Sequence, residues 1–567
     1  MSKGTLLLLS LGPVQSFIAS ARKTEDLWSG SYILSYMTEK AIALTQEQAE
    51  KQQLTVELIF PAAAEINLDL MVAAFPNRLL CLVHGDPDVT ARLAGAVESK
   101  LYDCFEKICS FGVEEVFSQS NIDLDALKAV VKDQAQGFFE VFWAVEPIRE
   151  DGYESARRKL EARLAAVKNN RKFDPHEQDG IVCTVCGERD ALHDRPYSPT
   201  ARIGAMRYQL RSTWAKRSRK YRSTGQTQSE RDDGGRIRDS EFLCGICLGK
   251  RTAREFFGEV RNRYYEPFRS TVDISHPRTY YSILVMDGDD MGQWLSGDKG
   301  QFSDPPGTVE YHQMISKRLA YFSGGVVPQL VTDAGGSLVY AGGDDVLALT
   351  PVINSFRLAG SLRAAFSDPK VGLHEEATAS MGMVIAYMKA PLGQALEQAR
   401  QMEKKAKSYV HPHTKKPKDA LGVSLVTNSG EIREFVLPWM LNGGPYQEDS
   451  IYNLVELMEE CVNLLEHELS PTFMFQLAQA FLPLVNQHGK LPQEHDKLLQ
   501  LELRRLLQRS LLKPTKEKKD LVDRLCPRLM NVHNVIGSTL EFIHWLESLK
   551  FFRKMKRGGR DQDETSA

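Results

Sequence analysis

Long hydrophobic runs are missing from this sequence of 567 residues, although 42% of its residues are hydrophobic. No apolar stretch approaches the roughly 18 residues that a membrane-spanning helix needs. The apolar run at residues 5–11 is too short for a span and lacks the flanks of a signal peptide. We therefore expect a cytoplasmic protein.

An excess of charge of either sign is also missing, because 71 Lys and Arg residues stand against 74 Asp and Glu residues, a formal net charge of −3. With 26% charged residues, the composition excludes the disordered, collagen-like and disulfide-scaffold classes of protein. At roughly 150 residues per domain, the length predicts about four globular domains.

Cysteine is scarce, with nine residues in the chain, which argues against a secreted disulfide framework. Five lie in apolar or amphipathic surroundings and are predicted to be buried, inert thiols: Cys81, Cys104, Cys109, Cys461 and Cys526. The other four form two Cys-x-x-Cys pairs: Cys183 with Cys186, and Cys244 with Cys247. Each pair has a glycine after it or within it, as zinc knuckles do, and four thiolates make a closed tetrahedral site. We predict structural zinc here, with His176 or His193 as substitute ligands and reduced free thiols as the alternatives.

Strand and helix patterns repeat in the same order in two parts of the chain. In residues 1–150 we predict strands at 5–11, 56–60, 78–84 and 138–145, with helices at 13–50 and 89–111. In residues 271–430 we predict strands at 280–286, 337–341, 346–350, 378–386 and 420–426, with helices at 312–333, 353–366 and 392–409. The first part has the order βαββαβ, and the second has the same order followed by one more helix and strand, which predicts two related α/β domains.

The other two parts have different patterns. Residues 151–270 contain the cysteine pairs, helical stretches and an Arg-rich insert that ends in a Gly-containing segment at residues 232–235, predicted to be flexible. Residues 431–567 show no strand pattern and alternate Leu-rich with charged positions at helical spacing. We predict a C-terminal helical domain there.

The strongest chemical signal is a pair of acidic motifs in the second α/β domain. The motif DGDDMG, residues 287–292, follows the first strand, and GGDD, residues 342–345, joins the second strand to the third. With antiparallel strand order 4-1-3-2, the end of the first strand and this turn lie at one edge of the sheet. Three carboxylates are then placed to bind two Mg²⁺ or Mn²⁺ ions: Asp287, Asp344 and Asp345.

Such a site predicts metal-dependent nucleotidyl transfer. Like charges this close repel one another unless a cation lies between them. Two metal ions activate a ribose hydroxyl and stabilise the transferring phosphoryl group and its pyrophosphate leaving group. The residues expected to contact the nucleotide, mainly through close backbone approach, are Gly288, Asp289, Asp290, Gly292, Gly342 and Gly343. The competing interpretation is an ordinary acidic hairpin turn.

The first α/β domain lacks these motifs. Its corresponding hairpin, residues 61–77, contains only Glu65 and Asp69, and its first strand ends in Leu11-Gly12-Pro13. We therefore predict that the first domain binds no catalytic metal.

Two basic stretches are candidate contacts for nucleic acid. Residues 207–239 carry eight Arg and two Lys against four acidic residues, a net charge of +6, with Tyr208, Trp214 and Tyr221 between them. Basic and aromatic residues together suit single-stranded nucleic acid, whereas a solvated helix followed by a loop is the alternative. Residues 550–560 hold six basic residues and no acid, which indicates a second phosphate contact or a frayed tail.

Several motifs resemble those of a known family. They are LGPVQSFIA at residues 11–19, ARKT at 21–24, DLWSGSY at 26–32, FPNR at 75–78, CTVCG at 183–187, DGDDMG at 287–292 and YAGGDD at 340–345. Together they are similar to the large subunit of type III CRISPR effector complexes, of the Cmr type (III-B). The similarity covers about residues 1–430, and the helical C-terminus fits by position only.

The resemblance implies two ferredoxin-like palm (cyclase) domains, a zinc-binding region between them and a C-terminal helical domain. It implies partners: CRISPR RNA, target RNA, a small subunit, backbone subunits and a subunit that binds the end of the guide. It further implies that target RNA switches on conversion of ATP into oligoadenylate second messengers, expected to be cyclic. Asp287, Asp344 and Asp345 would be the metal ligands, and Ser380 and Lys407 nucleotide contacts, with a plain surface lysine as the alternative for Lys407.

The sequence departs from the family at its start, because many members begin with an HD-type nuclease domain and here the Gly-Pro-Val-Gln motif starts at Gly12. We therefore expect no intrinsic DNA cleavage. Three alternative functions stay open: a catalytically silent scaffold of the same ribonucleoprotein, a synthase that joins AMP to another acceptor, and a cyclic dinucleotide synthase that acts alone.

Overall fold

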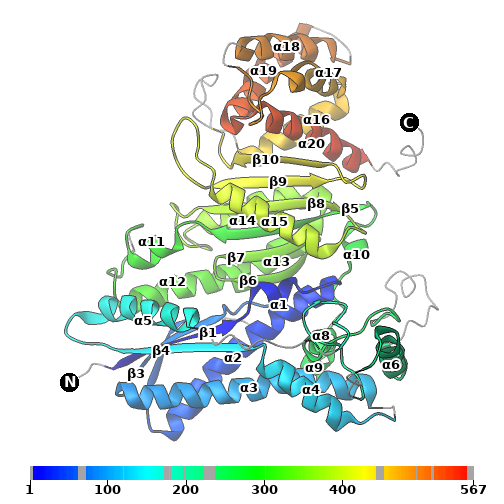
Figure 1. The fold of residues 1–567 in the computed structure, drawn as a ribbon. Coiled ribbons are helices and arrows are strands. Elements are labelled where there is room, and N and C mark those ends of the chain that lie inside the picture. Colours follow the sequence, from blue (N-terminus) through cyan, green and yellow to red (C-terminus); the bar gives the residue numbers. More distant parts are fainter. Residues whose placement is uncertain are drawn as a thin grey trace. The chain divides into compact units, whose positions relative to one another are not determined.

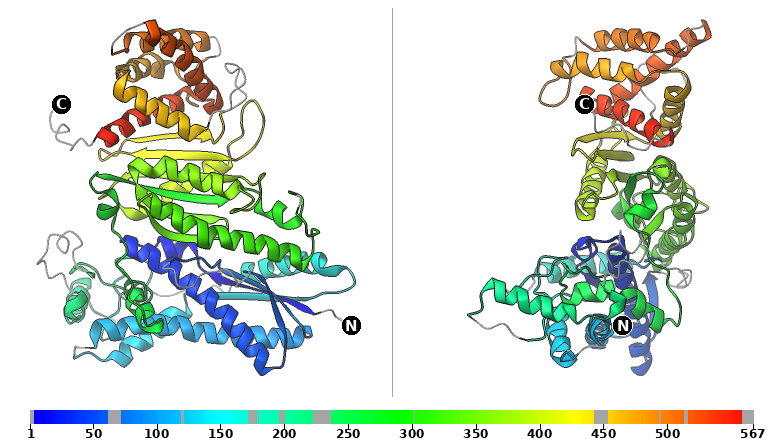
Figure 2. Two further views of the ribbon diagram at one scale, coloured as in Figure 1. Left: turned by 180° about the vertical axis from the view of Figure 1, so that it is seen from behind. Right: turned by 90° about the vertical axis from the view of Figure 1, so that its right-hand side faces the viewer.

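The computed structural model describes residues 4–61, 72–118, 121–170, 178, 180–195, 200–221, 236–300, 302–441, 453–492, 495–512 and 516–557. The chain divides into two compact units. The first comprises Met1–Ser270, Gly292–Gly325 and Val339–Gly343, and the second comprises Thr271–Met291, Val326–Leu338 and Asp344–Ala567. Figures 1 and 2 show helices packed on a β-sheet in each unit. Over the described ranges, no helix is long and apolar enough to cross a membrane.

The first unit is built on a four-stranded antiparallel sheet of order β2-β3-β1-β4. Its strands are β1 (Thr5–Gly12), β2 (Val56–Phe60), β3 (Arg78–Val83) and β4 (Glu140–Pro147). Its helices are α1 (Gln15–Ala19), α2 (Thr24–Lys51), α3 (Pro87–Phe117), α4 (Leu124–Gln136) and α5 (Gly152–Asn169). The predicted βαββαβ order is confirmed, and α4 is an additional helix that we did not predict.

Strand β1 is buried at all eight positions because helices cover both faces of this sheet. Leu6 and Leu8 pack with Leu160 of α5 on one face. Leu7 packs on the other face with Ala49 of α2 and Leu93 of α3. Since successive side chains of a strand point to opposite faces, a continuous Leu run is what a strand with two covered faces requires.

The single helix predicted at residues 13–50 is wrong, because the chain breaks between α1 and α2. The Asp26 carboxylate accepts the N–H groups of Arg22 and Lys23, at 3.0 and 3.1 Å, and fixes the start of α2. The buried ammonium of Lys250 donates to the carbonyls of Phe17 and Ser20, at 2.6 and 2.7 Å. A cation at the C-terminal end of α1 satisfies carbonyls that have no partner within the helix.

The cysteine region of the first unit is mainly helical. Its elements are α6 (Ile203–Ala215), the 3-10 turn η2 (Arg219–Tyr221), α8 (Gly245–Arg251) and α9 (Ala253–Val260). The unit also contains α12 (Val309–Tyr321), and α11 (Met291–Ser296) begins at the junction of the two units.

The second sheet has six strands in the order β10-β9-β8-β5-β7-β6. They are β5 (Tyr280–Gly288), β6 (Ser337–Gly342), β7 (Asp345–Pro351), β8 (Ala379–Tyr387), β9 (Ala420–Val426) and β10 (Ile432–Pro438). The β8-β5-β7-β6 part is the predicted 4-1-3-2 arrangement. Strand β9 extends it by parallel pairing with β8.

The helices of the second unit include α10 (Thr271–Ser275), α13 (Val327–Asp333), the 3-10 turn η4 (Val352–Asn354), α14 (Ser355–Ser367) and α15 (Leu392–Lys407). The π-helical turn η3 (Phe322–Val326) precedes α13 and belongs to the first unit up to Gly325. Helix α15 covers one face of the sheet, and α13 and α14 cover the other (Figures 1 and 2).

The prediction that no strand follows Gly430 is wrong, because β10 pairs antiparallel with β9. The outer edge of β10 is covered by helix α20 (Thr539–Arg557). The N–H of Val436 donates to the carboxylate of Glu541 at 3.2 Å, and the N–H of Glu434 donates to His544 Nδ1 at 3.1 Å. The hydrogen-bond partners of this strand edge are side chains of α20, 105 and 110 residues later in the sequence. The sequence around β10 therefore carries no local pattern that predicts a strand.

The rest of the described C-terminal segment is helical, as predicted. Its elements are α16 (Leu454–His467), α17 (Thr472–Phe481), the 3-10 turn η5 (Leu482–Leu484), α18 (Asp496–Arg509), α19 (Lys516–Ile536) and α20. Buried Leu, Phe, Met and Trp side chains form its core, as in other helix bundles.

Helix α15 lies unusually close to the sheet at two paired glycines. Gly382 of β8 and Gly422 of β9 are register partners. A Cβ at Gly382 would lie 2.0 Å from the Ala399 carbonyl oxygen, and a Cβ at Gly422 would lie 2.4 Å from the Met402 carbonyl oxygen. Only glycine fits at this distance from a helix backbone, so these two residues set the position of α15.

We expect Gly382→Val to destabilise the second unit by roughly 1–3 kcal/mol or more, because the added side chain must push α15 off the sheet. Denaturant unfolding measures the effect. The matched control is Gly393→Ala, since a Cβ at Gly393 in the same helix meets nothing within 4 Å. Equal stability of the two variants would contradict this packing argument.

Candidate metal and nucleotide site

Three aspartates meet at one edge of the second sheet. Asp287 is the penultimate residue of β5, Asp345 is the first residue of β7, and Asp344 lies in the turn that precedes it. Their carboxylates each offer an oxygen atom within 4.8 Å of the others. The sheet order therefore brings these distant residues together, as the two motifs predict.

Gly288 allows this close approach. A Cβ at Gly288 would lie 2.8 Å from Asp344 Cβ and 3.0 Å from the ring of Phe366 on α14. Any larger residue would push the Asp344 carboxylate away from Asp287. The structure thus gives Gly288 a role in positioning the carboxylates, whereas the sequence suggested a role in backbone contact with phosphate.

The electrostatics of the cluster favour a bound cation. Desolvation by the surrounding protein raises the pKa of Asp344 to about 6. The Asp345 side chain reaches solvent, yet nearby protein atoms, and then the carboxylates of Asp344 and Glu403, raise the pKa of Asp345 well above its usual value. A divalent cation with oxygen ligands removes this cost, so the residues present fit such an ion.

Helix α15 supplies two more charged groups to this edge. The ammonium of Lys407 is ion-paired with the Asp287 carboxylate and lies 3.4 Å from the Glu403 carboxylate one turn earlier. Burial, and then the ammonium of Lys418, lower the pKa of Lys407 to about 8. Lys407 therefore lies at the site, as predicted. We did not predict Glu403, although its i,i+4 spacing from Lys407 places both residues on one face of the helix.

Asp289 and Ser380 are buried behind the carboxylate cluster. The Asp289 side chain is 1% exposed and accepts hydrogen bonds from Ser380 Oγ at 2.8 Å and from Thr378 Oγ1 at 2.9 Å. Burial raises the pKa of Asp289, and these hydrogen bonds act in the opposite direction. In this structure both side chains are used in holding the turn, and the nucleotide contacts predicted for Asp289 and Ser380 stay predictions.

Asp290 has the left-handed conformation, with φ of 58°, and its carboxylate lies 2.5 Å from the ammonium of Lys418. The carboxylate of Asp290 is thus engaged in an ion pair within the protein, and the nucleotide contact predicted for this residue stays a prediction. Lys418 gave no signal in the sequence because it lies in a lysine-rich loop.

The remaining predicted glycines differ in their surroundings. Gly343 has φ of 74°, which the tight turn between β6 and β7 requires. Gly342 is buried, and a Cβ there would collide with the side chain of Tyr340. A Cβ at Gly292 would meet nothing within 4 Å, so this glycine is in open space.

The four cysteines of the two Cys-x-x-Cys pairs converge in the first unit. The sulfur atoms of Cys183, Cys186, Cys244 and Cys247 all lie within 4.8 Å of one another. Contact with Cys183 and the other thiols, together with burial, raises the pKa of both Cys244 and Cys247 well above that of a free thiol. Such a set fits one tetrahedral metal ion with four thiolate ligands. His193 lies outside this set, and His176 lies outside the described residues.

Helix α8 connects this cluster to the core of the first unit. It begins directly after Cys244 and ends in Lys250 and Arg251, both 1% exposed. The Arg251 guanidinium donates to both oxygens of the Asp26 carboxylate, at 2.8 and 3.0 Å, and holds the pKa of Asp26 at about 2 against the effect of burial. Helix α8 therefore links the cysteine cluster to Lys250 and Arg251, the two residues that stabilise the break between α1 and α2.

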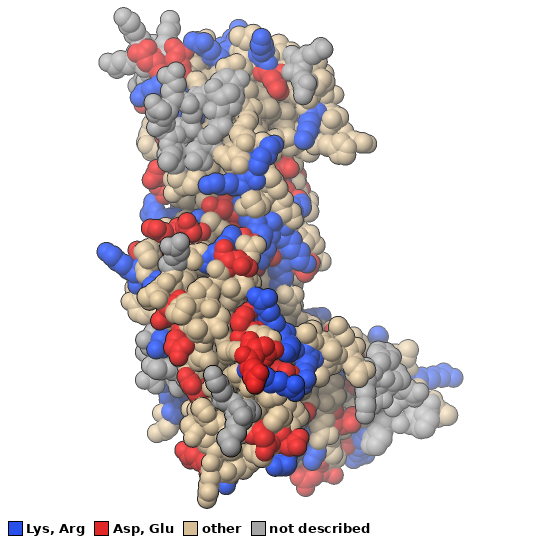
Figure 3. All heavy atoms as spheres, turned by 90° about the vertical axis from the view of Figure 1, so that its left-hand side faces the viewer, with Lys and Arg blue, Asp and Glu red and all other residues tan. Residues whose placement is uncertain are grey.

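The described residues of the two basic stretches have different surroundings. Trp214 and Tyr221 are buried at 1% and 0% exposure and are core residues, whereas Tyr208 is 79% exposed. Residues 222–235 lie outside the described residues, as do Glu65 and Asp69 of the first hairpin. Lys556 and Arg557 of the C-terminal stretch end helix α20 and contact Glu466. Figure 3 shows Lys and Arg side chains interspersed with Asp and Glu on the face it draws.

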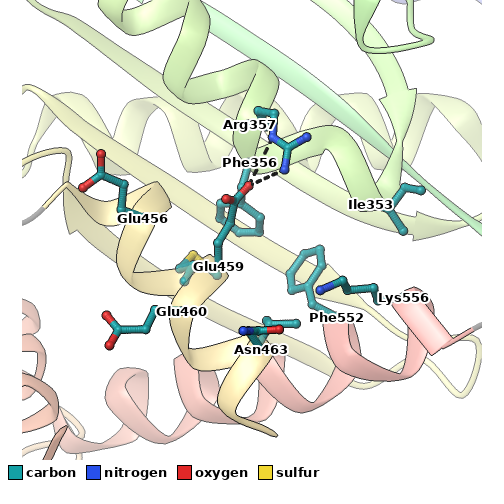
Figure 4. Close-up of a pocket in the computed structure, with 11 residues that line it drawn as sticks. Ile353, Phe356, Arg357, Glu456, Glu459, Glu460, Asn463, Phe552 and Lys556 are labelled. Carbon is teal, nitrogen blue, oxygen red and sulfur yellow. Dashed lines mark hydrogen bonds and ion pairs between the residues drawn. The ribbon is translucent and has the colours of Figure 1, made fainter. Parts of the chain in front are cut away.

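A separate hollow of about 490 Å³ lies among η4, α14, α16 and α20 (Figure 4). Phe356 and Phe552 contact each other edge to face, with ring centres 4.8 Å apart, and Arg357 pairs with Glu459 at its rim. The described residues that line this hollow include none of the predicted metal or nucleotide ligands. It is therefore distinct from the carboxylate cluster.

The raised pKa of Asp344 predicts a pH-dependent stability. In metal-free protein the folded state holds the Asp344 proton with a pKa of about 6 against a usual 3.8. This contribution to stability is present below about pH 4 and is lost as the pH rises through about 6. We expect the thermal midpoint of the native protein to fall relative to Asp344→Asn between these pH values, measured with a chelator present. A constant difference between the two proteins would contradict this.

Two family models match the chain. One, described as the second palm domain of Cas10/Cmr2, matches residues 280–420, which contain β5 to β8, the carboxylate cluster and α15. The other, described as the N-terminal region of the CRISPR-associated protein Cmr2, matches residues 6–110 of the first unit.

A curated relative is the CRISPR system Cmr subunit Cmr2 of Pyrococcus furiosus, 26% identical over 558 aligned positions that cover 77% of this chain. The alignment covers 63% of the relative's own length.

Two solved structures share the fold. They are type III-B Cmr-beta in the apo state and Cmr-beta bound to cognate target RNA, each with a TM-score of 0.63 and 14% identity. The first match covers 98% of this chain and 82% of the other, and the second covers 99% and 83%. Residues 6–110 and 280–420 are therefore similar in sequence to the N-terminal region and the second palm domain of Cas10/Cmr2 large subunits, and nearly the whole chain shares the fold of the Cmr-beta structures.

Proposed function

We propose that this chain is a target-RNA-activated nucleotidyltransferase that converts ATP into oligoadenylate second messengers within a type III-B CRISPR effector complex. The observation that supports this most directly is the convergence of Asp287, Asp344 and Asp345 at the end of β5 and the start of β7. Carboxylates at this edge of a palm domain hold divalent cations next to the phosphates of a nucleotide.

In this proposal Asp287, Asp344 and Asp345 hold Mg²⁺ or Mn²⁺. When bound, the ions activate a ribose hydroxyl and stabilise charge on the transferring phosphate. Lys407 exchanges its contact with Asp287 for a phosphate oxygen, and Glu403 keeps the ammonium close to the site. Asp289, Ser380 and Thr378 hold the turn rigid from behind.

The proposed partners are CRISPR RNA, target RNA and the other subunits of the complex. The P. furiosus relative is named as a subunit of a Cmr system, and one Cmr-beta structure of the same fold is bound to cognate target RNA. For the cysteine cluster we propose a structural Zn²⁺ ion, because four thiolates suit this ion in a closed site.

A catalytically silent scaffold in the same complex is the second candidate. The observation in its favour is the ion pair with Lys418, which occupies the Asp290 carboxylate. Metal-dependent ATP binding by the full chain separates the two, since a scaffold without a nucleotide site binds none at millimolar ATP. Mass spectrometry of the products separates oligoadenylates from AMP joined to another acceptor.

We expect the double variant Asp344→Ala and Asp345→Ala to lose at least roughly 100-fold in oligoadenylate formation, because the loss of metal ligands removes several kcal/mol of transition-state stabilisation. The assembled complex with ATP, Mg²⁺ and cognate target RNA is the system to measure. Target RNA binding by the variant complex is the control for assembly. Undiminished product from the double variant would show that the site is assigned wrongly.

We expect Cys247→Ser to release about one equivalent of zinc per chain and to lower the thermal midpoint, because three thiolates no longer close the tetrahedral site. Elemental analysis of the purified chain measures the metal. Cys104→Ser is the matched control, since this half-buried cysteine lies outside the cluster. Equal zinc content in both variants would refute the assignment.

A further inference from the structure

The loop between α15 and β9 is a lysine hairpin, residues 410–418, with a structure of its own. Val410 and Pro417 form a β-bridge, and the N–H of His411 donates to the Lys416 carbonyl at 2.9 Å. The buried His411 ring lies inside the bend, where its Nδ1 accepts the N–H groups of His413 and Thr414, each at 3.2 Å. The hairpin is thus a defined element that presents Lys415, Lys416 and Lys418.

One end of the lysine hairpin is fixed to the turn of the carboxylate site. Lys418 Nζ lies 2.5 Å from Asp290 Oδ1. The next residue, Asp419, donates its N–H to Asp289 Oδ2 at 3.1 Å, and its carboxylate pairs with Arg363 of α14 at 2.5 Å. These contacts hold the hairpin against the same turn, residues 287–290, that carries the predicted metal ligand.

The backbone at this contact is held in an unfavourable conformation. Asp290, Lys418 and Asp419 have φ of 58°, 62° and 51°, all in the left-handed region. Non-glycine residues adopt this region at a cost of about 1 kcal/mol or more each, and such residues are frequent at binding sites. The contacts of Lys418 and Asp419 with the turn and with Arg363 therefore hold this backbone in place and direct the Lys418 side chain toward Asp290.

Two ammonium groups consequently approach the turn from different elements. Lys407 comes from α15 and contacts Asp287, and Lys418 comes from the lysine hairpin and contacts Asp290. Both side chains remain accessible, with exposed fractions of 30% and 29%. Two cations held close together beside a metal site suit a ligand that carries several negative charges in a row, as a polyphosphate chain does.

We propose that Lys418 is a second phosphate-binding residue that, with Lys407, holds the triphosphate of the nucleotide, and that Asp290 is the positioning residue for Lys418. This inference rests on the proposed nucleotidyl transfer and deepens it. It replaces the direct nucleotide contact that the sequence suggested for Asp290. The two lysines hold the polyphosphate, and the adenosine part contacts neither of them.

The test compares two lysines of the same hairpin. Lys415 has φ of 58°, close to the 62° of Lys418, and its side chain is exposed. Asn is neutral and tolerates the left-handed region, so Lys418→Asn and Lys415→Asn remove one charge each with the same backbone demand. Calorimetric titration of the full chain with Mg²⁺ and a non-hydrolysable ATP analogue, and separately with AMP, measures the affinities.

We expect Lys418→Asn to weaken binding of the ATP analogue roughly 10- to 100-fold, as for a lost hydrogen bond between charged groups, with binding of AMP reduced much less. Lys418→Arg should restore most of the affinity, and Lys415→Asn should bind like the native chain. Asp290→Asn should give an intermediate loss, because Lys418 stays charged but is no longer held.

Two outcomes would overturn the inference. Native-like binding of the ATP analogue by Lys418→Asn would show that Lys418 contacts no phosphate. Equal losses for the ATP analogue and AMP would show that the substitution disturbs the whole site and that Lys418 is only structural. Absence of binding by the native chain would instead overturn the proposed function together with this inference.

Discussion

Asp287, Asp344 and Asp345 repel one another, and the second unit must hold their carboxylates within 4.8 Å despite that repulsion. The strand order places the end of β5 beside the turn before β7, and Gly288 leaves room for Asp344 to approach. Behind the cluster, Asp289 ties its turn to β8 through Ser380. These features serve one requirement, which is to keep negative charge concentrated where a cation and a phosphate chain can neutralise it.

Helix α15 places positive charge beside this negative charge. Gly382 and Gly422 let the helix backbone approach the sheet, and its last turns then deliver Glu403 and Lys407 to the carboxylates. In the first unit, the cysteine cluster has a comparable role: it fixes the start of α8, whose Lys250 and Arg251 hold the break between α1 and α2. In both units, residues distant in sequence position a helix, α15 or α8, whose last turns carry charged side chains. These side chains contact the carboxylate cluster in the second unit and the break between α1 and α2 in the first.

The sequence was sufficient for features with strong local patterns. The apolar runs predicted β1 and β5, and the glycine-flanked Asp motifs predicted which residues meet at the sheet edge. The cysteine spacing predicted a four-thiol cluster, although 57 residues separate Cys186 from Cys244. Features that depend on distant partners could not be predicted. Strand β10 exists because β9 and helix α20 satisfy its two edges. The sequence suggested that Trp214 could stack on a nucleic-acid base, but the tertiary fold buries this side chain. The role of Lys418 follows only from its contact with Asp290, which the sequence did not predict.

Manganese is a spectroscopic substitute for Mg²⁺ and tests the carboxylate site most directly. Electron paramagnetic resonance of Mn²⁺ with the full chain and a non-hydrolysable ATP analogue reports free and bound metal without requiring catalysis. We expect the native chain to bind Mn²⁺ in the presence of the analogue and Asp287→Asn to lose most of this binding. Equal Mn²⁺ binding by the native chain and by Asp287→Asn would contradict the claim that these carboxylates hold the metal.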